Sequence, residues 1–198
     1  MILAHGICMA LAGDGALQSP AIGAGMAADD DDRARIDFLT AESSIVLDRE
    51  GRWLHDGEPV THRGLAEALH RWIDFDEATS RYVLQAGRER CFIEVEDTPY
   101  FVRGVVWTGE PDAARVMLRL SDGTEEELDY ATLRQAPDNV LYCDVKGGRM
   151  PARFDRAAYY RVAERVDLDQ AGPVLAAAGS RWPIRRGDGT RPRRPASP

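Results

Sequence analysis

Short runs of alternating hydrophobic and polar residues recur through the middle of the chain. Residues 115–120 are the clearest case, because Val116, Leu118 and Leu120 fall on one face of an extended segment. Period-two alternation over so few residues is typical of half-buried β-strands. By this criterion and by flanking turn residues, strands are expected at residues 45–47, 53–55, 82–85, 91–95, 100–107, 115–120, 140–145 and 150–154.

Two segments instead place apolar residues at helical spacing. The first helix is expected over residues 62–73 with Thr61 as its N-cap, and the second follows Asp155 as its N-cap. A third, short helix is expected between Pro173 and Gly179, because proline suits a first helical turn and glycine a helix end. The stripes that the first two helices would bury are Leu65, Ala68, Leu69, Trp72 and Ile73, and then Tyr159, Val162, Ala163 and Val166.

The order of these elements repeats. Asp-Gly pairs, which are strong hairpin signals, occur at residues 56–57 and again 66 residues later at 122–123. In each half the expected order is a strand, an Asp-Gly turn, a second strand or sheet edge, a capped helical turn, and a hairpin closed by glycine. Residue identities barely match, so either an ancient duplication or chance recurrence of common turns explains the pattern. The sequence predicts an α+β fold of two small β-rich domains, at residues 38–97 and 98–169.

Charge is unevenly spread along the 198 residues. The net charge is −8, but six arginines and one aspartate give residues 181–198 a charge of +5, so residues 1–180 carry −13. An acidic body opposes broad nucleic-acid binding, which requires basic surface. Residues 170–198 are expected to form the short helix and then a disordered Arg/Pro-rich tail, which either solvates the protein or contacts nucleic acid or the acidic body.

The N-terminal segment and the cysteines narrow the class of protein further. No apolar run approaches the ~18 residues of a membrane helix, and Cys8, Cys91 and Cys143 lie too far apart for a disulfide scaffold. Residues 1–37 are expected to be a disordered or mis-annotated extension, in which residues 1–25 precede a true start at Met26, and order is expected to begin near Ile36 or Phe38. The sequence therefore predicts a cytoplasmic protein with no membrane partner.

Sequence motifs of common enzymes and cofactor sites are absent. The chain has no phosphate-binding loop, dinucleotide fingerprint, H-E-x-x-H or G-x-S-x-G motif. His62 and His70 are expected to be surface or helix-flanking residues, because no third ligand lies at metal spacing. Cys91 and Cys143 are expected to be buried free thiols. No catalytic residue, metal site or cofactor is therefore assigned.

The densest polar cluster follows the strand at residues 91–95. Glu94 and Glu96 share one face of the strand and Asp97 comes next, so these carboxylates could hold a divalent cation or act as acid and base. The alternative is a solvated strand face and an Asp-x-Pro turn that joins two domains. Arg153 on the last predicted strand either pairs with a carboxylate between the domains or holds an anionic ligand.

Several of these segments resemble DUF1285, a bacterial family of unknown function. The resemblance is carried by WLHDGEPV at residues 53–60, IEVEDTPY at 93–100 and MPARFDR at 150–156. It covers about residues 43–168, departs from the family pattern at residues 85–90 and is loose over residues 121–139, which is typical of a divergent member. Further matching positions are Arg63, Leu65, residues 82–84, Tyr159 and Tyr160.

The resemblance implies two small α+β domains built from a repeated motif, the second similar to a pleckstrin-homology-like barrel capped by a C-terminal helix. It also implies a ligand site between the domains, a role in regulation or signal transduction, and no enzymatic activity. The sequence thus favours a non-enzymatic binding module with a protein or peptide partner. The alternatives are a metal-assisted enzyme that uses Glu94, Glu96 and Asp97, and nucleic-acid binding through the arginine tail. The expected ligand-binding residues are Trp53, Arg63, Glu96, Asp97, Tyr100 and Arg153, with Trp53, Tyr100 and Arg153 as anchors.

Overall fold

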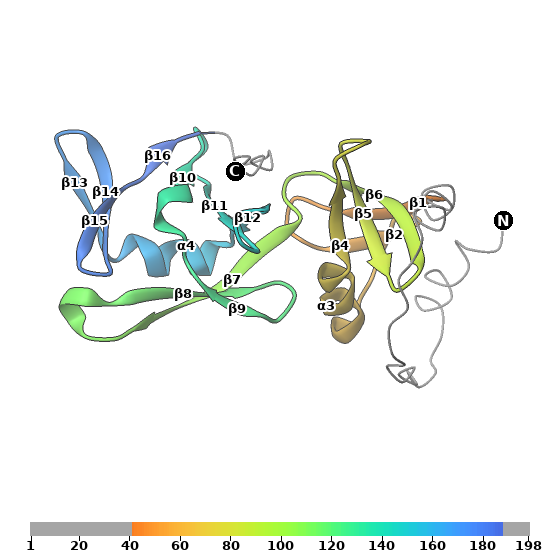
Figure 1. Cartoon of the computed structure of the whole chain (residues 1–198), viewed down its shortest axis with the longest axis horizontal. Helices are drawn as coiled ribbons and strands as arrows, with labels where there is room; N and C mark the ends of the chain where they lie inside the picture. The colour runs from red at the N-terminus through yellow and green to blue at the C-terminus, as the bar shows by residue number, and fades with distance from the viewer. Residues whose placement is uncertain (1–40, 188–198) are drawn as a thin grey trace, which may run out of the picture.

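The computed structural model of the chain describes residues 41–187 (Figure 1). The expectations for residues 1–37, for Met26 and for residues 188–198 lie outside this range. The first half is a six-stranded sheet with one helix, α3 (Arg63–Arg71). Its strands are β1 (Ala41–Leu47), β2 (Trp53–His55), β3 (Glu58–Pro59), β4 (Ile73–Asp76), β5 (Arg81–Ala86) and β6 (Glu89–Val95).

The second half is a seven-stranded sheet covered on its inner face by helix α4 (Arg156–Ala163). Two short 3₁₀ turns, η1 (Pro111–Ala113) and η2 (Tyr130–Thr132), join its strands. These strands are β7 (Tyr100–Thr108), β8 (Arg115–Leu120), β9 (Glu125–Glu127), β10 (Arg134–Gln135), β11 (Leu141–Val145), β12 (Met150–Phe154) and β16 (Arg185–Arg186).

The two sheets have the same topology. The first has the strand order β3-β2-β1-β6-β5-β4, and the second reads β9-β8-β7-β12-β11-β10 before β16 is added. Each contains a parallel pair at the corresponding place, β1 with β6 and β7 with β12, and β16 adds a second parallel pair, with β10, to the second sheet. The repeated motif predicted from the sequence is therefore present, with η2 standing where the first half has α3. Both Asp-Gly pairs form the expected turns, with φ of +82° at Gly57 and at Gly123.

The helices follow the predicted stripes with small shifts. Thr61 is not the N-cap of α3, because the Nδ1 atom of His62 accepts the hydrogen bond from the Leu65 N–H at 3.1 Å. The helix also ends before Ile73, which pairs with Leu84 as the first residue of β4. Asp155 caps α4 as expected, accepting from the Ala158 N–H at 2.8 Å.

A third sheet replaces the predicted C-terminal helix. It consists of β13 (Val166–Asp169), β14 (Gly172–Ala177) and β15 (Ser180–Pro183). The helix expected between Pro173 and Gly179 is wrong, because Gly179, at φ +68°, turns the chain back as a hairpin and Leu175 is buried in the second core. The expectation of a disordered tail is also wrong for residues 180–186.

The second sheet does not close into the expected pleckstrin-homology-like barrel. Within residues 41–187, β9 and β16 are the two unpaired edges. β9 is only three residues long and two of its glutamates are exposed, which is typical of a strand that ends a sheet. The coarser prediction of two β-rich halves agrees with the structure, and α4 packs against β7, with Ala158 and Val162 buried in the core.

The halves lie side by side along the long axis of the molecule, with the β13–β15 sheet at the far end (Figure 1). Each half has its own hydrophobic core, and β7 contributes to both. Tyr100 and Val102 belong to the second core, whereas Phe101 points the other way and is 1% exposed within the first. Because successive side chains of a strand point to opposite faces, one strand joins the two cores.

Candidate functional site

The junction between the halves is built around the turn at residues 48–52. The Asp48 carboxylate accepts hydrogen bonds from the N–H groups of Glu50 and Arg52 and from the Arg52 guanidinium, at 2.7 to 3.0 Å. Burial alone would raise the pKa of Asp48, but the hydrogen bonds from Arg52 and Glu50 outweigh it and hold the pKa below its ordinary value. The turn is therefore rigid where it meets the second half.

Two arginines of the second half donate to the backbone of this turn. Arg103 on β7 reaches the carbonyl oxygens of Glu50 at 3.3 Å and Gly51 at 2.9 Å. Arg153 on β12 reaches the carbonyl of Arg49 at 3.2 Å. Charge-assisted hydrogen bonds of this kind are stronger than neutral ones, so they fix the orientation of the two halves.

Gly51 allows the close approach of the halves. Its φ of +75° suits glycine, and a Cβ atom at this position would lie 2.7 Å from a ring carbon of Phe101. The Arg103 guanidinium lies over the same Phe101 ring, 4.9 Å from its centroid. A side chain at position 51 would collide with Phe101 and Arg103, so the two halves could not approach as closely.

A buried histidine lies behind this contact. His70 is 2% exposed, its Nδ1 atom lies 2.8 Å from the indole Nε1 of Trp53, and its carbonyl accepts from the Tyr100 hydroxyl at 3.0 Å. The indole N–H can only donate, and Nδ1 also lies 2.9 Å from the carbonyl oxygen of Ala66, which can only accept, so the two groups compete for this nitrogen. The Nε2 atom has no hydrogen-bond partner among the described residues. Burial lowers the pKa of His70 to about 4, so the ring is neutral near pH 7.

A second polar network lies at the end of the linker, residues 96–99. The Asp97 carboxylate accepts from the Arg153 guanidinium at 2.6 Å and from the Tyr142 hydroxyl at 3.1 Å. Burial, and then the Asp97 charge, raise the pKa of Tyr142 to about 12. Glu96 lies outside this network and accepts from the Arg49 N–H at 3.3 Å.

Comparison with solved structures finds two DUF1285 family proteins. A DUF1285 family protein from Silicibacter pomeroyi superposes with a TM-score of 0.62 and 19% identity, over 76% of this chain and 86% of that protein. This chain has the DUF1285 fold. A second DUF1285 family protein, from Shewanella baltica, gives a TM-score of 0.48 at 18% identity, over 62% of this chain and 91% of that protein. No protein-family model and no curated protein matches the chain.

The DUF1285 resemblance predicted from the residues is thus confirmed in the fold. Five of the six expected ligand-binding residues lie at the junction, but Arg63 does not: it is exposed on α3 and pairs with Glu67 at 2.8 Å. Trp53 and Tyr100, which were expected to anchor a partner, are both buried, Trp53 in the first core and Tyr100 in the second, so neither side chain is presented at the surface. Of the set, Glu96 and Arg153 lie at the solvent-exposed edge of the junction, here called its rim, and the Asp97 side chain, 7% exposed, lies just inside it.

Sequence reasoning missed Phe101, Arg103, Tyr142 and His70 at this junction. One signal was available for Phe101, which is a large apolar residue on the face of β7 opposite to Tyr100 and Val102. His70 was expected at the surface and instead fills the core beneath Trp53. His62 does flank a helix, as its N-cap.

The carboxylates Glu94, Glu96 and Asp97 do not converge. Asp97 is turned toward Arg153 and Tyr142, and Glu94 is exposed on β6. Within residues 41–187, no group of three or more His, Cys, Asp or Glu side chains is placed to hold a metal ion. Cys91 and Cys143 are buried free thiols, and burial raises the pKa of both, so neither is poised as a nucleophile.

Replacing Asp97 with asparagine is expected to lower the free energy of unfolding by about 1 to 3 kcal/mol, because Arg153 loses the charge that neutralises it in a mostly buried site. Urea denaturation measures the change. Glu96→Gln is the matched control, since its carboxylate is 40% exposed and its contact with Arg49 is at the 4.0 Å limit. An equal effect of both variants would contradict a structural role for the Asp97–Arg153 pair.

Proposed function

We propose that this chain is a non-enzymatic binding module that takes a protein or peptide partner at the rim of the junction. The observation that carries this proposal is a set of exposed charged side chains on a turn that hydrogen bonds to Asp48, Arg103 and Arg153 hold in place. Rigid placement of the contact groups lowers the entropy cost of binding. A regulatory role in the cytoplasm, for example in signal transduction, is part of the proposal. No helix within residues 41–187 is long and apolar enough to cross a membrane.

The charge pattern of the rim supports a protein partner. Arg49 and Arg52 are about 70% exposed, and Glu50 and Glu96 stand beside them. Alternating charges of this kind fit a complementary protein surface, on which arginine often contributes much of the binding energy. They fit a nucleic-acid backbone poorly, because the two glutamates would repel phosphates.

Arg49→Glu tests the proposal, because it reverses an exposed charge on the turn and leaves intact the backbone carbonyl that Arg153 contacts. We expect a specific partner captured from native cell extract by the full chain to be reduced about tenfold with this variant. Arg161→Glu is the control, because Arg161 is similarly exposed on α4, away from the junction. The proposal fails if no captured protein depends on Arg49, or if both variants lose the same proteins.

A thermal-shift series with divalent cations and EDTA tests the metal-assisted alternative. The binding module predicts a midpoint that Mg²⁺, Mn²⁺ and Zn²⁺ leave unchanged within about 1 °C, in the wild type and in Glu96→Ala alike. A metal-dependent rise that Glu96→Ala abolishes would contradict the proposal and favour the enzyme.

A further inference from the structure

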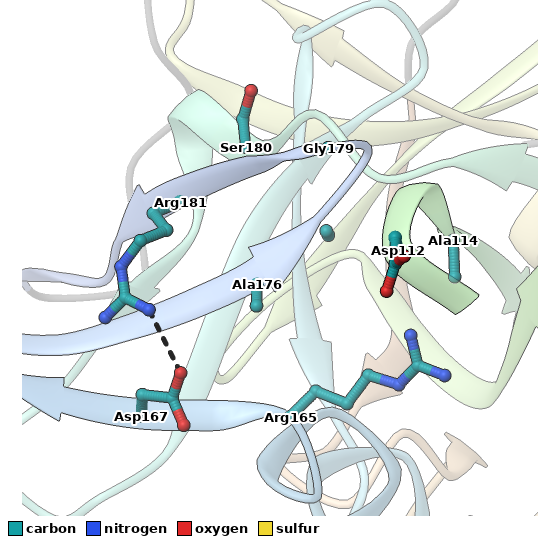
Figure 2. A pocket seen from close by; sticks show the side chains of 9 residues that line it. Asp112, Ala114, Arg165, Asp167, Ala176, Gly179, Ser180 and Arg181 are labelled. Carbon is teal, nitrogen blue, oxygen red and sulfur yellow. Dashed lines mark hydrogen bonds and ion pairs between the residues drawn. The ribbon is translucent and has the colours of Figure 1, made fainter. Parts of the chain in front are cut away.

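A groove lies at the end of the second half that is remote from the junction (Figure 2). Its volume is about 820 Å³, and it is lined by η1, by Arg165 in the link between α4 and β13, and by all three strands of the small sheet. This size is within the range of sites that hold small ligands. None of the residues expected from the sequence to bind a ligand lies here.

Hydrogen bonds and a ring stack next to the groove hold its walls in place. The Ala178 N–H donates to the carbonyl of Ala114 at 2.9 Å, which ties the β14–β15 hairpin to the start of β8. The Trp182 indole donates to the carbonyl of Ala177 at 3.1 Å and stacks on Tyr130, with centroids 5.1 Å apart. The groove is therefore part of the folded structure and does not require a ligand to form.

Two arginines and two aspartates give the groove charges of both signs. The Arg165 guanidinium lies 4.4 Å from the centroid of the Trp107 ring, whose own N–H donates to the carbonyl of Arg161. In Figure 2, Arg165 extends toward Asp112 and Ala114, and the Arg181–Asp167 pair, 3.1 Å apart, stands on the other side of Ala176.

The floor between these charges carries no long side chain. Ala114, Ala176 and Ala177 contribute only methyl groups, and Gly179 none. A ligand can therefore lie close to the backbone with one charged end on each side. An anion with several charges, such as a phosphate ester, would meet the two aspartates, whereas a ligand with one charge of each sign matches the equal numbers of arginines and aspartates that line the groove.

We propose that this groove binds a short peptide with free amino and carboxyl termini. The carboxylate lies against Arg165, whose planar guanidinium is pre-oriented by the Trp107 ring and can donate two parallel hydrogen bonds. The ammonium group lies beside Asp167, across the Ala176 floor, and takes the place of the exposed Arg181 guanidinium on this carboxylate. This site is separate from the junction and does not depend on the function proposed there.

Titration of the ¹⁵N-labelled full chain with trialanine tests the proposal. We expect saturable shifts at the amides of Ala176, Ala177, Gly179 and Ser180. Amidation of the peptide's C-terminus is expected to weaken binding about tenfold or more, because it removes the charge that Arg165 recognises. Arg165→Gln is expected to weaken trialanine binding to a similar extent, whereas Arg161→Gln, the matched control on the same helix, changes it by less than about twofold.

Asp167→Asn provides a second variant that leaves the Trp107–Arg165 contact intact. It is expected to weaken binding of trialanine but not of N-acetyl-trialanine, which has no ammonium group. The proposal is overturned if trialanine gives no saturable shift in the groove or if trialanine amide binds as tightly. It is also overturned if inorganic phosphate shifts the same amides more strongly than trialanine at equal concentration, or if the shifts fall on junction residues alone.

Discussion

Replacing Phe101 with alanine is expected to lower the free energy of unfolding by about 3 to 5 kcal/mol, the range for truncating a fully buried aromatic side chain. Phe101 lies on a strand of the second sheet but fills the core of the first half, against Gly51. Its loss leaves a cavity where the halves meet. Guanidinium denaturation, followed separately by tryptophan fluorescence and by far-UV circular dichroism, measures the effect and shows whether the halves still unfold together.

Val106→Ala is the matched control for Phe101→Ala. Val106 lies on the same strand but is 51% exposed, so its truncation should cost less than about 1 kcal/mol. We also expect the wild type to give one transition by both probes and Phe101→Ala to separate them. A small effect of Phe101→Ala, similar to that of Val106→Ala, would show that the first core does not depend on β7.

Acidification from pH 6.5 to pH 4 is expected to remove about 3 kcal/mol of stability through His70 alone. The pKa of His70 is lowered from 6.5 to about 4 in the folded protein, so in this range the unfolded chain binds a proton that the folded chain does not. The contribution is complete above pH 6.5 and lost as pH falls toward 4. Urea denaturation at several pH values measures the free energy of unfolding, and the slope of this free energy against pH checks the expected loss.

His70→Asn isolates this effect from other titrations. Its side-chain oxygen can accept from the Trp53 indole in place of Nδ1, but the residue does not titrate. The nearest charges, Arg103, which lowers the pKa of His70, and Asp122, which raises it, are present in both proteins. The wild type should therefore lose more stability than His70→Asn between pH 6.5 and 4, and parallel curves would contradict a buried neutral histidine.

Local sequence patterns predicted most strands, both helices and the repeat. Asp-Gly turns, the stripe from Leu65 to Trp72 and the Asp155 cap each act within a few residues, so the sequence alone reveals them. The prediction for the segment after Asp169 was wrong, because Pro173 and Gly179 fit a short helix as well as a hairpin. Pairing of β14 with β13 and β15, together with burial of Leu175, decided between these alternatives.

The linker at residues 96–99 could be singled out from the sequence, but the contacts that the two halves make around it could not. Trp53, Tyr100 and Arg153 were singled out as residue types that bind partners, and the first two proved to be internal contacts. A sequence cannot show that Arg103 and Arg153 will meet backbone carbonyls some 50 and 104 residues away. The groove at Arg165 is likewise formed by segments that come together only through tertiary packing.

Because strand β7 contributes to both cores, the two halves are not independent folding units. A fragment ending at the linker would lack Phe101, and a fragment beginning there would expose this ring to water. We therefore expect limited proteolysis near residues 96–99 to release no stable piece, although the matching topologies point to an origin by gene duplication. Once the duplicated halves share a core side chain in this way, neither half can fold with an unrelated domain in place of the other.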